Sequence, residues 1–295
     1  PFINEKYGHA EFGRNAGMEN QTISSMGVFN DNIMAHELTH QWFGDKITCT
    51  DWQNIWLNEG FATYGEAIYN ESAFGQAAYK DFINFKMSDA KNAHGSIYVQ
   101  DVNDINQIFS GNRSYAKGCV VLHMLRGVVG DSVFFDILKS YATNPELTFK
   151  NAVTEDFKLV AESIYGSSLN YFFDEWIYGE NYPKYNVGWT SVPLNQTQYI
   201  VTINITQDVN INPAFFTMPV QIKIITQAGD SLVTVFNNSQ SQNFEFIVNS
   251  KPLNFKFDPD NLILKDVRGE DIIPVRYSLS QNYPNPFNPD TKISY

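Results

Sequence analysis

Two histidines four residues apart, His36 and His40, restrict the fold of this sequence more than any other feature. Residues four apart share a face of an α-helix, so both imidazoles can reach one metal ion. A carboxylate, Glu59, follows nineteen residues after His40 in a second stretch that reads as helix. Two histidines and one carboxylate are the ligand set of a catalytic zinc site, which leaves one position for water. The pattern therefore predicts one Zn²⁺ ion held between two helices.

Glu37 stands next to the first of these histidines, about 100° around the helix from it. That angle makes it a poor third ligand but lets it touch the water, which indicates a general base. An amphipathic helix with hydrogen-bonded core histidines is the alternative, and the later Glu59 disfavours it. Glu59, Thr63 and Glu66 recur at helical spacing, so Glu66 either orients a ligating histidine or lies on a solvated face.

Four motifs stand in a fixed order: Gly-Met-Glu-Asn at 17–20, His-Glu-Leu-Thr-His-Gln-Trp-Phe-Gly-Asp at 36–45, Trp-Leu-Asn-Glu-Gly-Phe-Ala at 56–62 and Tyr-Ala-Lys-Gly at 115–118. With this order and spacing the chain resembles the aminopeptidase N family of zinc peptidases, which are gluzincins. The similarity runs from about residue 1 to about residue 185. It implies a thermolysin-like, mainly α-helical catalytic domain.

The resemblance also implies roles for single residues. Tyr115 would stabilise the oxyanion of the tetrahedral intermediate, and Glu19 would grip the α-amino group of a peptide, which makes the enzyme an exopeptidase. Gly17 permits a close approach of substrate to the backbone, and Met18 lies beside it. The sequence departs from the family at Ala16, where the family has glycine, and this departure puts side-chain selectivity in doubt.

Composition excludes two classes of partner. The net charge is −12 and the sequence has no basic run, so binding to a nucleic-acid backbone has no electrostatic basis. No apolar run approaches the ~20 residues that span a bilayer. The negative charge favours cationic ligands, including a free peptide amine.

Cys119 is expected to be a buried free thiol, and a disulfide between Cys49 and Cys119 is the alternative.

The pattern of residues predicts a multi-domain chain with a catalytic domain over 1–186, a small β-sandwich over 187–269 and a tail over 270–295. Helices are expected at 33–43, 58–70 and 74–91, from 114 onward, and through 131–180. In that last block Asp131, Thr154 and Ser168 suit N-caps, and Gly166 and Gly179 suit helix ends. Apolar residues alternate in 201–205, 220–224, 244–248 and 253–257, which is typical of strands.

The tail is rich in proline and asparagine, with prolines at 284, 286 and 289. Three prolines in six residues forbid a helix. The tail resembles the start of the C-terminal sorting domains of the type IX secretion route in Bacteroidetes-like bacteria, and a plain linker is the alternative. The resemblance implies a secreted or cell-surface bacterial protein that meets type IX secretion machinery. Both ends are expected to be cut, with no signal peptide in this fragment and a preceding β domain missing.

The function that these features favour is a zinc-dependent aminopeptidase, which hydrolyses the N-terminal bond of peptides with a zinc-activated water. His36, His40 and Glu59 would hold the metal, with Glu37 as general base. A thermolysin-type endopeptidase and a secreted zinc-bearing module without activity are the alternatives. The preferred N-terminal side chain, the oligomeric state and the activity of the fragment do not follow from the sequence.

Overall fold

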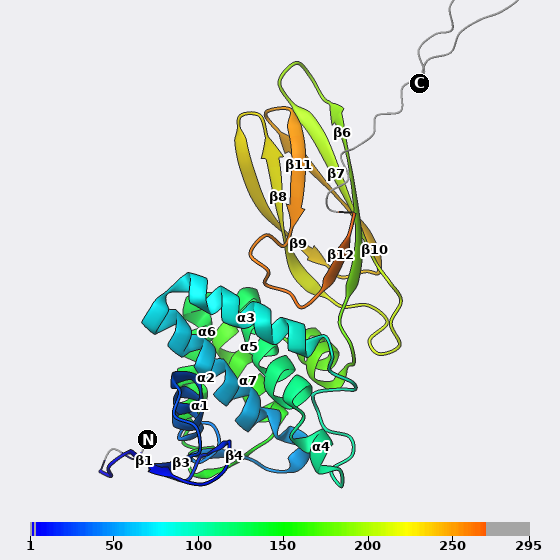
Figure 1. Cartoon of the computed structure of the whole chain (residues 1–295). Coiled ribbons are helices and arrows are strands. Elements are labelled where there is room, and N and C mark those ends of the chain that lie inside the picture. The colour runs from blue at the N-terminus through cyan, green and yellow to red at the C-terminus, as the bar shows by residue number, and fades with distance from the viewer. Residues whose placement is uncertain (1, 3, 270–295) are drawn as a thin grey trace, which may run out of the picture.

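The computed structural model describes residues 2 and 4–269 of the chain. Helices gather at one end of an elongated molecule and strands β6–β12 at the other, with the N-terminal strands below the helices (Figure 1). The helical elements are α1 Asp31–His40, η1 Trp52–Asn54, α2 Trp56–Phe74, α3 Gln76–Ala90, α4 Ile105–Ile108, the π-helix η2 Gly111–Lys117, α5 Gly118–Val129, α6 Asp131–Thr143, α7 Thr154–Tyr165, α8 Asn170–Phe173 and the π-helix η3 Asp174–Tyr178.

Helix α1 begins at Asp31, two residues before the predicted start at 33. The side chain of Asn30 caps it by accepting the backbone N–H of Ile33 at 2.9 Å, and Asp31 complements the positive end of the helix. The helix ends at His40, three residues earlier than expected. Helix α2 begins at Trp56 and ends at Phe74, so it is longer at both ends than predicted.

Small residues let α2 approach its neighbours closely. A Cβ added at Gly65 would lie 2.0 Å from Oγ1 of Thr39, and one at Gly60 would lie 3.0 Å from the backbone of Gly118. Gly65 and Thr39 thus mark the contact between α2 and α1, and Gly60 and Gly118 mark the contact between α2 and α5. Glycines at these crossings therefore bring Glu59 close to the two histidines.

Two small sheets flank the site. Strands β1 Gly8–Glu11, β2 Gly17–Met18 and β3 Ile23–Met26 form a sheet of order β1-β3-β2, in which β2 runs antiparallel to β3. Strand β4 Ile47–Cys49 pairs in parallel with β5 Lys150–Ala152. The β4–β5 pairing ties the segment after α1 to the segment before α7.

The core of the helical part is aromatic. Phe61 of α2 contacts Tyr141 of α6 and Phe157 of α7, with ring centroids 5.8 and 5.0 Å apart. The core also includes Phe172, Phe173, Trp176 and Ile177, all of which are buried. Cys49 and Cys119 are both buried and free, so the disulfide alternative is wrong.

The C-terminal strands form two sheets. Their bounds are β6 Lys184–Pro193, β7 Tyr199–Gln207, β8 Met218–Thr226, β9 Gly229–Asn237, β10 Ser241–Val248, β11 Pro252–Phe257 and β12 Asp266–Arg268. The sheet orders are β10-β7-β6-β12 and β11-β8-β9. Tyr185 of β6 contacts Phe257 of β11, and Trp189 contacts Phe255, so the faces of the two sheets share apolar side chains.

Several local predictions need correction. Val153 and Gly130 occupy the N-cap positions of α7 and α6, one residue before the predicted Thr154 and Asp131. The hydroxyl of Thr154 instead donates to Oδ1 of Asn54. Leu169, not Ser168, precedes α8, whereas Gly166 and Gly179 do end helical segments.

The predicted alternation fails at one strand end. Leu253 is 45% exposed, because a register shift between Pro252 and Asn254 turns it away from the face that Phe255 and Phe257 share. Strands β6, β9 and β12 were not predicted, and β6 begins at Lys184, before the expected boundary at 187.

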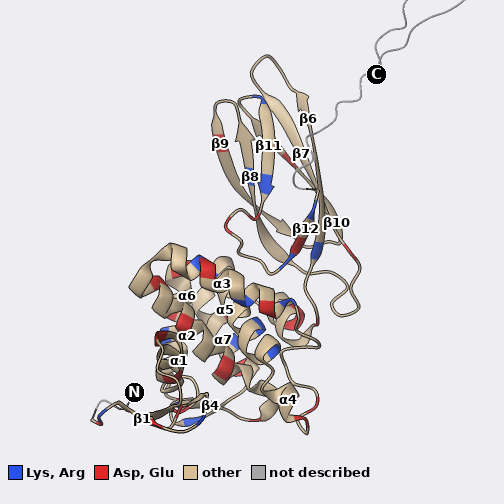
Figure 2. Cartoon of the chain, viewed as in Figure 1, with Lys and Arg blue, Asp and Glu red and all other residues tan. Residues whose placement is uncertain are grey.

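The tail at 270–295 lies outside the described residues, so its resemblance to a sorting domain stays a prediction. Within 2 and 4–269, none of the helices has the length and apolarity that crossing a membrane requires. Acidic and basic side chains are interspersed over the helical part, without a basic face in the view of Figure 2.

His123 is a hydrogen-bonded core residue, as predicted. Its Nδ1 lies 2.8 Å from the hydroxyl of Tyr79, and its Nε2 lies 3.1 Å from the carbonyl oxygen of Asn261. Burial lowers the pKa of His123 to about 4, so the ring stays neutral. The ring therefore links α5 to the loop that follows β11.

Glu175 makes a second link, because its carboxylate accepts the backbone N–H of Thr217 just before β8. Burial raises the pKa of Glu175 to about 7, although hydrogen bonds from Thr217 oppose that rise. The folded carboxyl thus keeps its proton to a higher pH than the unfolded one, whose pKa is about 4.3. The contribution of Glu175 to folding stability is therefore fully present below the unfolded pKa. It is lost as the pH rises through the folded pKa of about 7.

We therefore expect Glu175→Gln to raise the melting temperature at pH 8 by about 2–4 °C and to leave it unchanged at pH 4. Thermal unfolding followed by circular dichroism at both pH values measures this. Glu146→Gln, at a side chain that is 85% exposed, is the matched control and should show no pH-dependent difference. Equal shifts for Glu175→Gln at both pH values would contradict the assignment.

Candidate active site

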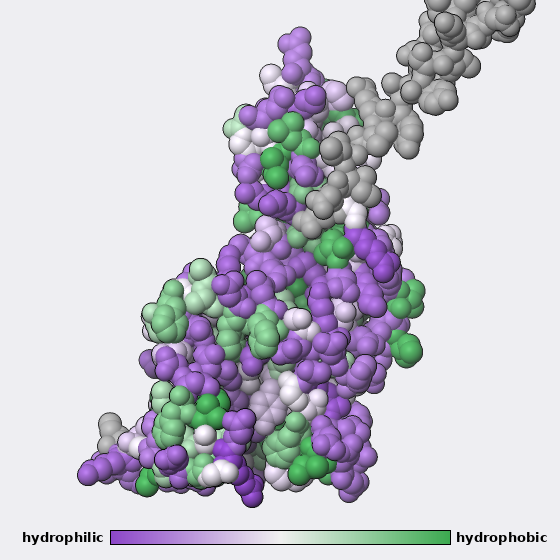
Figure 3. Space-filling view, viewed as in Figure 1, coloured by the Kyte–Doolittle hydropathy of each residue, from purple (hydrophilic) through white to green (hydrophobic). Residues whose placement is uncertain are grey.

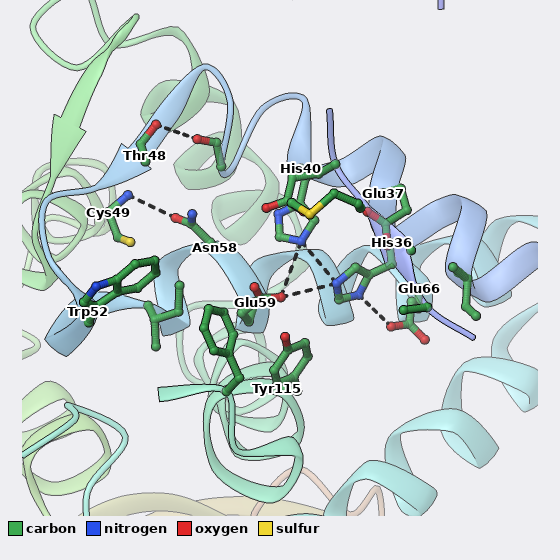
Figure 4. A pocket seen from close by; sticks show the side chains of 18 of the residues that line it. His36, Glu37, His40, Thr48, Cys49, Trp52, Asn58, Glu59, Glu66 and Tyr115 are labelled. Atoms are coloured by element: carbon green, nitrogen blue, oxygen red, sulfur yellow. Dashed lines mark hydrogen bonds and ion pairs between the residues drawn. The ribbon is translucent and has the colours of Figure 1, made fainter. Parts of the chain in front are cut away.

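Three predicted ligand atoms converge between α1 and α2. Nε2 of His36 and Nε2 of His40 lie 3.1 Å apart, and each lies 3.4 Å from Oε2 of Glu59 (Figure 4). These donors belong to one group that could hold a metal ion, and Glu37 is not part of it.

The spacing of these atoms fits a zinc ion. Ligand atoms at 2.0–2.1 Å from a tetrahedral zinc stand roughly 3.3 Å from one another. The observed separations of 3.1 and 3.4 Å match that value. Imidazole nitrogen and carboxylate oxygen are also the donors that catalytic zinc takes. The three residues therefore fit one Zn²⁺ ion.

Hydrogen bonds orient both imidazoles. Nδ1 of His36 lies 2.9 Å from Oε1 of Glu66, and Nδ1 of His40 lies 3.0 Å from the carbonyl oxygen of Phe43. When each Nδ1 donates its proton outward, each Nε2 turns a lone pair toward Glu59. Glu66 is thus placed as an orienting partner rather than on a solvated face, with its side chain 13% exposed. The Phe43 contact was missed, because a backbone oxygen leaves no signal in the residue pattern.

The charges of the site call for a cation between the ligands. Burial alone would lower the pKa of His36, but hydrogen bonds to Glu59 and Glu66 raise it to about 10. Burial alone would raise the pKa of Glu59, and its bonds to the two histidines lower it to about 2. A protonated imidazole balances the carboxylate without metal, and a metal ion can take that place.

Glu37 points into the cavity beneath β2. A Cβ on Gly17 would lie only 1.9 Å from Oε1 of Glu37, so the strand passes directly over the carboxylate. Its Oε2 has no hydrogen-bond partner among the described residues. Burial raises the pKa of Glu37 to about 7, against the effect of the two protonated histidines. A carboxyl with a free oxygen and this pKa suits proton exchange at neutral pH.

Tyr115 lies across the cavity on η2 (Figure 4). Its ring stacks on the His36 imidazole, with centroids 5.9 Å apart and planes inclined by 13°. Burial and the Glu59 charge raise the pKa of Tyr115 far above its usual value, so its hydroxyl remains a donor. The π-helical geometry is common at functional sites. It was not predicted, since the sequence indicated an ordinary helix from 114.

The cavity has a volume of about 840 Å³, and all nine predicted site residues line it. From β2 come Gly17 and Met18, followed by Glu19. Met18 is 44% exposed. Ala16, the position that departs from the family pattern, also lines the cavity. Other lining residues escaped prediction, among them Trp52 and Phe109. Their signal was weak, because aromatic residues in loops are common.

A comparison with family models matches residues 16–176 to the peptidase family M1 domain, which is over half of the chain. The chain belongs to peptidase family M1. The matched region contains α1, α2 and η2, and hence all the candidate site residues described above. Resemblance to the aminopeptidase N family is confirmed at this level.

Curated relatives of this M1 chain carry aminopeptidase names. "Probable aminopeptidase 1" of Sulfurisphaera tokodaii is 31% identical over 206 residues, which are 66% of this chain and 26% of the relative. "Aminopeptidase M1" of Arabidopsis thaliana is 32% identical over 158 residues, 51% of this chain and 18% of the relative. The chain thus spans about a quarter or less of the length of these relatives.

Solved structures agree on the fold. Legionella pneumophila aminopeptidase A superposes with a TM-score of 0.71 at 18% identity, covering 92% of this chain and 32% of that one. A variant of an M1 zinc metallopeptidase from Deinococcus radiodurans, bound to a Tyr-Ser-Ala substrate, gives a TM-score of 0.54 at 27% identity. It covers 60% of this chain and 40% of that one.

Proposed function

We propose that this M1 chain is the catalytic part of a zinc aminopeptidase, which hydrolyses the N-terminal peptide bond of its substrates. One observation carries the proposal: the His36, His40 and Glu59 donors, the free oxygen of Glu37 and the ring of Tyr115 surround a single cavity. Family membership supports it. The D. radiodurans structure, which holds a Tyr-Ser-Ala substrate, supports peptides as substrates.

His36, His40 and Glu59 would hold the metal. When bound, zinc supplies Lewis acidity that polarises the scissile carbonyl and makes water easier to deprotonate. Glu66 keeps the His36 ring in its ligating orientation through the 2.9 Å contact to Nδ1. The protein's remaining work is to move a proton, stabilise an oxyanion and position the amine.

Glu37 takes the proton of the attacking water. Its free Oε2 accepts that proton, because the pKa of Glu37 near 7 lets the carboxyl gain and lose a proton at neutral pH. The same carboxyl then gives the proton to the leaving amine. Gly17 keeps β2 close above this carboxyl and so excludes bulk water from that side.

Tyr115 donates its hydroxyl hydrogen to the oxyanion of the tetrahedral intermediate. We expect Tyr115→Phe to lower kcat by about 100- to 1,000-fold with little change in KM, because the bond forms chiefly in the transition state. Steady-state kinetics on a leucine amide substrate measures this. A matched control is Tyr165→Phe, at an exposed residue outside the cavity. An unchanged kcat for Tyr115→Phe would remove Tyr115 from this role.

Glu19 binds the α-ammonium of the substrate. It follows β2 at the edge of the cavity, and the lining residues among 2 and 4–269 include no lysine or arginine that would compete for its charge. An amine held there places the first peptide bond, rather than an internal one, beside Glu37. This distinguishes an aminopeptidase from a thermolysin-type endopeptidase.

The test uses paired peptides on the full-length, zinc-loaded protein. A peptide with a free N-terminus should lose its first residue, and the same peptide acetylated at the N-terminus should stay intact. Cleavage of both would favour the endopeptidase. If neither peptide is cleaved although zinc is bound, the alternative of a secreted zinc-bearing module without activity is favoured.

We also propose that the chain divides into a catalytic domain at about 1–186 and a β-sandwich domain at about 187–269. The end of η3 at Tyr178 and the start of β6 at Lys184 support a boundary near this point. Contacts between Tyr185 and Phe257 and between Trp189 and Phe255 support a sandwich. Export through the tail remains a separate hypothesis, which secretion of a tail-deleted protein would test.

A further inference from the structure

The cavity has two ends along α1. Ile33 and Glu66 line the end beside His36, whereas Gly44, Thr48 and residues 49–52 line the end beside His40. Figure 4 shows this division, with Thr48, Cys49 and Trp52 on the His40 side and Glu66 on the other side of His36. A peptide that crosses the site therefore sends its first side chain toward one end and its later residues toward the other.

The path of the segment at 17–22 indicates which end of the cavity receives the N-terminal residue of the substrate. Gly17 lies over Glu37, and the backbone N–H of Thr22 donates to Oε1 of Gln41 at 2.9 Å. The segment thus runs along α1 from Glu37 toward the His40 end, and Glu19 lies within it. An N-terminal residue whose amine meets Glu19 therefore lies where its side chain can reach the residues that line the His40 end.

That end carries two exposed aromatic side chains in mutual contact. Trp52 is 51% exposed and Phe109 is 40% exposed, with ring centroids 5.6 Å apart at an angle of 64°. Ile55 and Cys49, both buried, also line the cavity. Large aromatic side chains that pair at a cavity wall, rather than burying themselves, are typical of ligand sites. Figure 3 shows the surface hollowed between the N-terminal segment and the region of α4, with apolar side chains on the α4 side.

Both aromatic side chains stand on rigid supports. In the turn that begins η1, Asp51 Oδ1 accepts the backbone N–H of Asn54 at 3.2 Å and its side-chain amide at 2.8 Å. Asn54 in turn accepts the backbone N–H and the hydroxyl of Thr154. The hydroxyl of Ser114 donates to the carbonyl oxygen of Ile108 at 2.7 Å, which ties the Phe109 loop to η2. The wall is therefore preformed, and binding does not have to order it.

Charge at this end disfavours an acidic side chain. None of the lining residues in the described part of the chain is lysine or arginine, so an aspartate or glutamate side chain would lose its hydration without a counterion. The Asp51 carboxylate is already engaged by Asn54. The other side chains at this end are aromatic or apolar, or are uncharged polar groups such as Thr48, Thr50 and Asn58.

We infer that Trp52 and Phe109 form the subsite for the side chain of the substrate's N-terminal residue and select large apolar or aromatic residues there. The inference rests on the proposed function and adds its substrate class. Because a single methylene group changes kcat/KM by about 10–200-fold in such pockets, phenylalanine amide, whose side chain is larger by a whole ring, should exceed alanine amide by at least about that factor.

The experiment compares kcat/KM of zinc-loaded protein on phenylalanine, leucine, alanine, glutamate and arginine aminomethylcoumarin amides. Trp52→Ala and Phe109→Ala should each reduce the phenylalanine-to-alanine ratio of kcat/KM about tenfold. Phe85→Ala, at a side chain of α3 that is 62% exposed and lies outside the cavity, is the matched control and should keep the ratio. A ratio unchanged in both cavity variants, or a preference for glutamate or arginine amide, would overturn the inference.

A binding measurement separates this inference from the proposed function. Calorimetry on zinc-loaded Glu37→Gln protein compares Phe-Ala-Ala with Glu-Ala-Ala and Arg-Ala-Ala, so it needs no turnover. Tighter binding of Phe-Ala-Ala, weakened about tenfold by adding Trp52→Ala, supports the subsite even if the wild type cleaves nothing. Equal binding of the three peptides overturns the subsite even if the wild type is an active aminopeptidase.

Discussion

Glu37→Gln should lower kcat by about 10³- to 10⁴-fold while zinc content stays at one ion per chain. Glutamine keeps the shape of the side chain and lies outside the ligand group, so the metal site is left intact. It cannot accept a proton, however, and the free oxygen of Glu37 is the acceptor that the cavity offers to water. Steady-state kinetics together with metal analysis by mass spectrometry measures both quantities.

The control for this variant is Glu146→Gln, which replaces a carboxylate far from the cavity. It should match the wild type in turnover and zinc content. Near-normal turnover by Glu37→Gln would refute the general-base role. Loss of zinc together with turnover would instead mean that Glu37 supports the ligands.

Glu59→Gln should abolish zinc binding and, with it, activity. Replacing an outer-shell partner typically costs 10–100-fold in metal affinity, so losing a charged ligand should cost more than about 100-fold. Glutamine also leaves the two buried histidines without the carboxylate that lies 3.4 Å from each Nε2. Competition against a zinc chelator, followed by kinetics after zinc is restored, measures the effect.

Glu66→Gln provides the graded comparison. It keeps an oxygen that can accept from Nδ1 of His36 but removes the charge, so zinc affinity should fall by no more than about 10–100-fold. Excess zinc should then restore turnover in Glu66→Gln and not in Glu59→Gln. Equal zinc affinity in Glu59→Gln and the wild type would contradict the ligand assignment.

Much of the candidate site could be predicted because its signals are local. The spacing of His36 and His40 fixes a shared helix face, and Asn30 marks the start of that helix. Four motifs in order also supplied a family resemblance, which the match over 16–176 confirms. Helix ends and N-caps were less predictable. Thr154, for example, is drawn into a buried contact with Asn54, and such a tertiary contact overrides its capping preference.

The C-terminal strands show where prediction from the sequence fails. Alternating residues in β7 and β8 were recognised, whereas β6 and β9 were overlooked despite similar alternation. At Leu253 the bulge in β11 reverses the inward and outward positions, and no single residue type announces it. Register depends on partner strands that are distant in sequence, so a pattern read along one strand does not determine it.

The sequence by itself predicted the group of three possible metal ligands, the helix that pairs two of them and the carboxylate beside them that we propose as the base. Helical periodicity relates His36 to His40, since it links residues only a few positions apart, whereas Glu59 followed from its place in a later motif. Tertiary structure alone decided that Glu66 orients His36, that Gly17 crosses above Glu37 and that Trp52 meets Phe109. Those contacts join segments that are distant in sequence, so only the packing of the folded chain brings them together.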